Sequence, residues 1–561
     1  MMPTWLKYIF IGVSVLAIVV IGLLVFTSLP IGDFGKLLAQ GGAKELRDPM
    51  RPARAEGPRV IVFAIDGLGD SEMRAAAADG RVPKMAAFLG ADDASEETWR
   101  NAYAPRGVLS ILPSTTYAAW TAVFTGEPVA VAGISGNEWF DRASMRFMAP
   151  APVSVSGHGD AIRVYTEGLL DDWVAVPTLF EKADVRSYAS LLAQHRGADL
   201  LVQPNPGMLG ELIAAFTVGV GQDEDVSPDT YSALDRQAAK DLLTAIDEYG
   251  LADLTVVYIP GIDLFTHVAA DALSKQIDYL ADVVDPIVGE VLGAFDIRGA
   301  LDDTYVVFVA DHGHTPALGT DAHALGTGGD DEWPSIIEDA GFRMRPFEKE
   351  TEDDAFQAVF AYQGAFAYLY LADRSTCPNQ GERCAWISAP RFEEDVLAAV
   401  RAIDVANRTG EPVPELGGTI DMIFARRPNG TGDAAPFEVW DGERLVPVGE
   451  YLATNPRPDL VDLEARLEAM SAGPLGHFVG DVLLMSRYRF EDPIEQRFYF
   501  SRTYRSWHGS PSRQDSEIVF IVGQRGSSGE ELRQMVREAV GRDIPNQLDV
   551  TPLVLRLLDV E

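Results

Sequence analysis

The sequence predicts an α/β fold, in which a mainly parallel sheet carries helices on both faces. Four short runs are apolar without interruption: Val60–Ile65, Leu254–Ile259, Tyr305–Ala310 and Ile518–Val522. Longer amphipathic segments lie between them: Ser71–Leu89, Asp229–Tyr249 and Ala270–Phe295. Apolar strands that do not alternate with polar residues are typical of a parallel sheet buried on both faces. The 47% of hydrophobic residues indicates a folded chain.

The chain divides into five predicted parts. They are a transmembrane anchor (1–30), a stalk (31–57), the first part of a catalytic domain (58–330), an inserted cap lobe with a core extension (331–474) and the second part of the catalytic domain (475–561). The lobe has β-like runs at Ala365–Leu371 and Thr419–Phe424 among many prolines. The segment that starts at Thr551-Pro552 has an N-cap, a first-turn proline and an apolar stripe. It predicts a closing helix that packs on the sheet.

The predicted anchor has no charged residue between Lys7 and Asp33, and Tyr8–Phe26 is almost wholly apolar. A helix of that length comes close to the ~30 Å hydrocarbon core of a bilayer. We expect an uncleaved anchor; a signal peptide is the alternative. Basic residues after the span favour a cytoplasmic domain. The pair Cys377 and Cys384 favours a disulfide in an oxidising compartment, and we therefore expect the domain outside the cytoplasm, periplasmic or extracellular.

The charge balance excludes one class of partner. The chain carries 46 Lys+Arg against 84 Asp+Glu, a formal net charge of −38. A field of that sign repels a nucleic-acid backbone, so we expect no nucleic-acid groove. It also repels anionic phosphate substrates unless local cations reverse it at the site. Bound metal ions would supply that local positive charge.

Three aspartates share a position at the end of an apolar run. Asp66 ends VIVFAID, Asp263 follows LTVVYIPGI, and Asp311 ends TYVVFVAD. Ligands bind at the carboxyl ends of strands in an open parallel sheet. Three of the eight histidines lie nearby: His267 four residues after Asp263, His312 beside Asp311, and His508 before the last apolar run. Carboxylate and imidazole groups are ligands of catalytic zinc.

A threonine in LPSTTYAAWTAVFTG is the candidate nucleophile. Thr116 stands where a helix would begin after Pro113. The residue there is most often a capping threonine. A hydroxyl at a helix N-terminus also meets free N–H groups that favour a bound phosphate, and a metal could stabilise its alkoxide. The residues alone leave both interpretations open.

Together these segments resemble the alkaline phosphatase superfamily, most closely its type I phosphodiesterase/nucleotide pyrophosphatase branch. Six stretches occur in the family's order between Val60 and Gly523: VIVFAIDGLGD, LPSTTYAAWTAVFTG, GISGNEWFD, YIPGIDLFTH, FVADHGHT and WHGSPSRQDSEIVFIVG. The resemblance implies an alkaline-phosphatase-like fold. It also implies a metal-dependent phosphoric ester hydrolase with two zinc ions that acts on a small phosphate-ester substrate.

The resemblance further implies the roles of individual residues. One zinc would be held by Asp263, His267 and His508, and the other by Asp66, Asp311, His312 and Thr116. Thr116 would form a phosphothreonine intermediate, while Asn137 and the backbone N–H of Tyr117 bind a phosphoryl oxygen. Thr115, Ala119 and Ala132 depart from the family pattern, but none of them would be a ligand. His314 and His323 are interpreted as turn or supporting histidines, and for His314 a turn role is favoured.

Several other functions stay open. A phosphomonoesterase or a phosphoethanolamine-type phosphotransferase would use the same threonine chemistry. A sulfatase is disfavoured because the sequence has no C/S-x-P-x-R nucleophile motif. A binding module without activity is disfavoured because all seven expected metal ligands are present. The absence of an obvious arginine for a dianionic phosphate favours a diester. Oligomeric state is not readable from the sequence.

Overall fold

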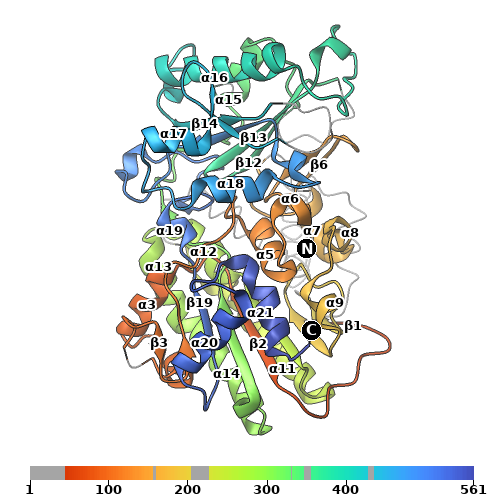
Figure 1. Ribbon diagram of the computed structural model, residues 1–561, viewed down its shortest axis with the longest axis vertical. Helices are drawn as coiled ribbons and strands as arrows, with labels where there is room; N and C mark the ends of the chain where they lie inside the picture. The colour runs from red at the N-terminus through yellow and green to blue at the C-terminus, as the bar shows by residue number, and fades with distance from the viewer. Residues whose placement is uncertain are drawn as a thin grey trace, which may run out of the picture.

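The computed structural model describes residues 44–91, 93–155, 159–203, 226–329, 331–346, 355–427 and 435–560. Figure 1 shows two lobes stacked along the long axis, the larger one below and the smaller one above. The predicted anchor and the part of the stalk up to residue 43 lie outside the described residues. Among the residues that are described, no helix is both long enough and apolar enough to cross a membrane.

The larger lobe contains a nine-stranded sheet with its parallel strands in the middle. Their order across the sheet is β1 (Lys44–Leu46), β8 (Leu200–Val202), β7 (Ser187–Ser190), β9 (Leu254–Ile259), β2 (Arg59–Ile65), β10 (Thr304–Val309), β19 (Phe520–Gly523), β4 (Ala102–Tyr103) and β3 (Thr98–Trp99). The five strands from β8 to β10 are parallel. The outer strands pair antiparallel, and these include β19, which arises from one of the four predicted apolar runs.

Helices cover both faces of this sheet, as predicted. Every side chain from Val60 to Ile65 in β2 is 0% exposed. Because successive side chains of a strand point to opposite faces, both faces must be covered. The helices of one packed set are α3 (Asp70–Ala78), α4 (Pro83–Leu89), α11 (Asp229–Tyr249), α12 (Gly261–Val268), α13 (Ala272–Tyr279) and α14 (Asp285–Ile297). Those of the other are α5 (Thr116–Thr125), α6 (Val129–Ala132), α9 (Leu179–Ala183), α20 (Gly529–Val540) and α21 (Val550–Leu557).

The predicted helix boundaries hold in part. The segment Asp229–Tyr249 is a single helix, α11, and the closing helix α21 contacts β2. The segment Ser71–Leu89 is not one helix but two, α3 and α4. Gly80 follows α3 with a positive φ of 67°, and Pro83 begins α4. A proline at a first helical turn starts a new helix and cannot continue an old one.

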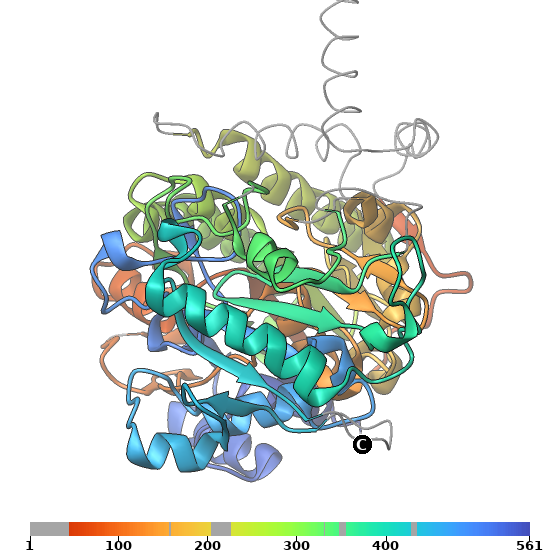
Figure 2. The same ribbon diagram turned by 90° about the horizontal axis from the view of Figure 1, so that it is seen from above.

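The smaller lobe contains a six-stranded antiparallel sheet. Its order is β12 (Ala358–Gln363), β13 (Phe366–Leu371), β17 (Val482–Ser486), β14 (Ile420–Ala425), β15 (Glu438–Trp440) and β16 (Leu445–Pro447). Helices α15 (Trp333–Asp339) and α16 (Leu397–Thr409) pack with it, and α16 crosses the sheet in Figure 2. The predicted pair Cys377 and Cys384 forms a disulfide in this lobe. Strand β17 comes from the predicted second catalytic part; the five-part division itself stays a prediction.

Candidate active site

Three buried aspartates meet where the central parallel strands end. Strands β9, β2 and β10 are neighbours, and their pairing in register brings their carboxyl ends to one edge of the sheet. Asp66 directly follows β2, and Asp311 lies two residues after β10. Asp263 lies in the first turn of α12, which follows β9. All three are at most 3% exposed. This confirms the expectation that the three acidic residues share one edge.

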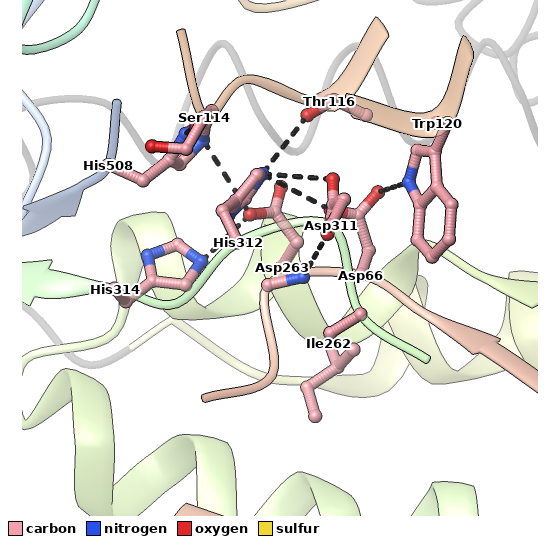
Figure 3. Close-up of polar contacts among 12 residues, drawn as sticks. Asp66, Ser114, Thr116, Trp120, Ile262, Asp263, Asp311, His312, His314 and His508 are labelled. Atoms are coloured by element: carbon pink, nitrogen blue, oxygen red, sulfur yellow. Dashed lines mark hydrogen bonds and ion pairs between the residues drawn. The ribbon is translucent and has the colours of Figure 1, made fainter. Parts of the chain in front are cut away.

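Helix α12 places Asp263 and His267 one turn apart, as the Asp-x-x-x-His spacing predicted. The His267 Nε2 lies 3.4 Å from the Asp263 Oδ2. The other carboxylate oxygen, Oδ1, lies 2.8 Å from the His314 Nε2 and 3.9 Å from the His508 Nε2. Figure 3 shows the His314 and His508 side chains converging on Asp263.

A second set of ligands surrounds the Nε2 of His312. This nitrogen lies 3.0 Å from the Asp311 Oδ2 and 3.6 Å from the Asp66 Oδ1. The Thr116 hydroxyl lies 3.4 Å from the same nitrogen (Figure 3). The structure therefore brings together the four residues that the family resemblance assigned to one metal.

The protein holds one oxygen of each of two carboxylates and leaves the other facing the site. The Asp66 Oδ2 accepts a hydrogen bond from the Trp120 indole at 3.3 Å and another from the Tyr258 hydroxyl. The Asp311 Oδ1 accepts from the backbone N–H of Gly67 at 2.9 Å. In the described part of the chain, the Asp66 Oδ1 and the Asp311 Oδ2 have no hydrogen-bond donor. These two oxygens are the ones that face His312.

Backbone carbonyls fix the tautomer of three histidines. The Nδ1 atoms of His267, His508 and His312 lie 2.8, 2.8 and 3.1 Å from the carbonyl oxygens of Ser506, Ser114 and Gly313. A carbonyl oxygen can only accept, so each Nδ1 carries a proton, and in the neutral ring each Nε2 presents a lone pair to the carboxylates. This is the arrangement that orients histidine ligands toward a metal.

The contact of His314 with Asp263 is suited to a shared cation. The Ser506 hydroxyl donates to the Thr266 carbonyl at 2.8 Å, so it accepts from the His314 Nδ1 at 3.1 Å. Burial lowers the pKa of His314 to about 4, so the ring is neutral near pH 7. Its Nε2 lone pair then faces a carboxylate oxygen at 2.8 Å. Two acceptors at this distance repel each other unless they share a proton or a metal ion.

The raised pKa values of the buried carboxylates also show that the site favours added positive charge. Burial raises the pKa of Asp66 well above its ordinary value, and the neighbouring Asp311 and Asp263 raise it further. Burial likewise raises the pKa of Asp311. The ligand atoms form three overlapping groups within 4.8 Å of one another: Asp66/Asp311/His312, Asp263/His267/His314 and Asp263/His312/His508. Such mixed carboxylate and imidazole sets fit divalent transition metals.

These groups correct the interpretation of one histidine. His314 is not a turn histidine: it is 0% exposed and contacts Asp263 more closely than His508 does. The sequence showed only that His314 lies two residues after His312. His323, by contrast, is partly exposed and its ring stacks on Phe498.

Helix α5 presents Thr116 at its first turn. Thr115, not Thr116, is the N-cap residue, and its side chain makes no capping hydrogen bond. The capping interpretation of Thr116 is therefore wrong. Thr116 is the one residue between Ile111 and Thr125 that is not fully buried. Thr116 is thus partly exposed, and its hydroxyl faces the candidate metal ligands.

Asn137 lies beside the same helix N-terminus. Its Oδ1 lies 3.4 Å from the backbone nitrogen of Tyr117. Its Nδ2 has no hydrogen-bond partner among the described residues, although the side chain is 2% exposed. A buried amide that lacks an acceptor is the arrangement that an incoming phosphoryl oxygen would satisfy.

Comparison with known proteins identifies the region that carries this site. Residues 60–327 match the family model described as type I phosphodiesterase / nucleotide pyrophosphatase. This region belongs to that family. The match includes six of the seven predicted metal ligands, and only His508 lies beyond it. The match supports the resemblance to this branch of the alkaline phosphatase superfamily.

Two solved structures are similar to this chain at low sequence identity. Murine ectonucleotide pyrophosphatase/phosphodiesterase 5 is 10% identical, with a TM-score of 0.48 over 90% of this chain and 95% of that one. An inactive variant of the same murine protein in complex with AMP is also 10% identical, with a TM-score of 0.47 over 90% and 96%. No curated protein sequence matches this chain.

Proposed function

We propose that the protein hydrolyses phosphodiesters at this site, with Thr116 as the nucleophile and two zinc ions as cofactors. The observation that carries the proposal is the set of histidine Nε2 lone pairs aimed at buried carboxylates beside an accessible hydroxyl. Asp66, Asp311, His312 and Thr116 would hold one ion. Asp263 would hold the other with His267, His508 and His314.

The metal ions would supply positive charge that favours ionised hydroxyl groups and offsets the charge of the reacting phosphate. The main electrostatic influences on Asp66 and Asp311 are other carboxylates and His312, with no lysine or arginine among them. The same lack of a protein cation favours a singly charged diester over a doubly charged monoester.

The chain's own groups would position and attack the phosphorus. The Thr116 Oγ1 forms a bond to phosphorus while the bond to the leaving ester oxygen breaks, which gives a phosphothreonine ester. The Asn137 Nδ2 and the Tyr117 N–H donate to a phosphoryl oxygen, where the N-terminus of α5 favours negative charge. Water then cleaves the ester, and Thr116 regains its hydroxyl.

We further propose that the enzyme is anchored to a membrane with its catalytic domain outside the cytoplasm. The Cys377–Cys384 disulfide supports an oxidising compartment. The apolar segment Tyr8–Phe26 supports the anchor.

Kinetics with a monoester and a diester of the same leaving group would test the proposal. The diester should react with the higher kcat/KM, and a faster monoester would instead indicate a phosphatase. Thr116→Ala should lose at least about 10³-fold in kcat. Thr115→Ala is the matched control, because Thr115 is buried and its hydroxyl has no hydrogen-bond partner among the described residues. Equal activities of the two variants would show that the nucleophile is another group.

A further inference from the structure

The smaller lobe reaches the active site through the turn between β12 and β13. This turn consists of Gln363, at the end of β12, followed by Gly364 and Ala365. The backbone N–H of Ala365 donates to the His508 carbonyl at 3.2 Å. The same turn therefore lies beside a proposed metal ligand on one side and, through Gln363, beside Asn137 on the other.

The Gln363 amide bridges the backbone of Asn137 and Glu138. Its Oε1 accepts from the Asn137 N–H at 2.9 Å, and its Nε2 donates to the carbonyl of Glu138. Gln363 is 1% exposed. One side chain thus satisfies an N–H and a carbonyl of adjacent residues, and only an amide offers a donor and an acceptor in this geometry.

Neighbouring residues hold the same backbone in place and leave space for the Gln363 amide. The Ser154 hydroxyl donates to the Asn137 carbonyl at 2.8 Å, and the Glu138 carboxylate accepts from the backbone N–H of Tyr362 at 2.7 Å. A Cβ at Gly136 would come within 1.9 Å of the Gln363 Oε1. Residue 136 must therefore lack a side chain for the Gln363 amide to approach.

We propose that Gln363 is a positioning residue for the phosphate-binding amide of Asn137, so that the smaller lobe completes the active site. This inference rests on the proposed function. The Tyr117 N–H contacts the Asn137 Oδ1 at 3.4 Å, and the backbone that carries Asn137 sets the position of its Nδ2, which has no partner in the described residues. Gln363 holds that backbone. The antiparallel sheet of the smaller lobe is the support that fixes the Gln363 side chain in place.

A double-mutant cycle on the full-length protein tests this role. Gln363→Met keeps the length of the side chain and removes both hydrogen bonds. It should lower kcat/KM by about 10- to 100-fold, the scale of a misplaced contact, with the metal content unchanged. Gln363→Glu keeps the acceptor for Asn137 but loses the donor to Glu138, and its loss should be smaller. In an Asn137→Ala background, Gln363→Met should change kcat/KM by less than about twofold, since its effect acts through Asn137.

Gln357→Met is the matched control. Gln357 is also a buried glutamine of the smaller lobe, 4% exposed, but it bonds to the Arg343 N–H and the Cys377 carbonyl, away from Asn137. The Gln357→Met variant should lose as much free energy of unfolding as Gln363→Met does, and it should retain its kcat/KM. Full activity of Gln363→Met, or an equal loss with and without Asn137, would overturn the inference. An Asn137→Ala variant of normal activity would instead refute the proposed role of Asn137.

Discussion

Alanine at Gly67 should disrupt the metal site without disrupting the fold. Gly67 has a φ of 71°, where an added Cβ costs about 1–2 kcal/mol. The Cβ would lie 2.6 Å from the His314 Nε2 and 3.0 Å from the Asp263 Oδ1. To regain an ordinary contact of 3.4 Å, His314 must retreat by about 0.8 Å. A displacement of that size in an active site costs up to about 10²-fold in rate.

Gly80→Ala separates this displacement from backbone strain. Gly80 has a similar φ of 67°, and nothing lies within 4 Å of its added Cβ. With zinc removed by a chelator, both variants should therefore show the same backbone cost in the free energy of unfolding in urea, and Gly67→Ala should add only the cost of moving His314. Only Gly67→Ala should lose bound zinc, measured by elemental analysis after gel filtration, and only it should lose about 10- to 100-fold in kcat/KM. If Gly67→Ala matches Gly80→Ala in zinc content and rate, His314 and Asp263 do not hold a metal.

Three more predictions follow from the buried polar groups. Trp120→Phe and Tyr258→Phe each remove a donor to the Asp66 Oδ2, so titration calorimetry should show zinc affinity weakened about 10- to 100-fold. Unchanged affinity would mean that Asp66 is not a ligand. Zinc that binds only the native state should raise the free energy of unfolding by about 4 kcal/mol at free zinc 1,000 times Kd, and a chelator should reverse this; no chelator effect would argue against a structural contribution. Burial raises the pKa of Asp235 to about 7. The wild type should therefore lose stability from about pH 4, where this carboxyl ionises in the unfolded chain, up to about pH 7, where it ionises in the fold, and Asp235→Asn should flatten that slope. An equal slope in both proteins would show that Asp235 does not titrate.

The central strands and the acidic and histidine residues at their ends were predictable because their signals are local. An uninterrupted apolar run such as Val60–Ile65 can be buried on both faces only in a covered sheet, and the residue after it must lie at the sheet edge. The spacing of Asp263 and His267 needs one helical turn, and α12 provides it. These residues meet because β9, β2 and β10 are parallel neighbours.

The supporting residues were not predictable because their signals lie far apart in the chain. Tyr258 is an inward-facing strand residue, and its bond to Asp66 joins positions 192 residues apart. Gln363 reaches Asn137 across 226 residues and from another lobe. No periodicity links such positions. The antiparallel direction of β19 was also not predictable, because the composition of a short apolar run does not show whether the strand pairs parallel or antiparallel to its neighbour.

The stereochemistry at phosphorus tests the central claim most directly. A diester made chiral at phosphorus with sulfur and oxygen isotopes would be hydrolysed by the full-length enzyme, and the configuration of the product determined. Attack by Thr116 followed by attack of water makes two in-line displacements, each of which inverts phosphorus. The account therefore predicts net retention. Net inversion would show that water attacks the substrate directly and that no threonine ester forms.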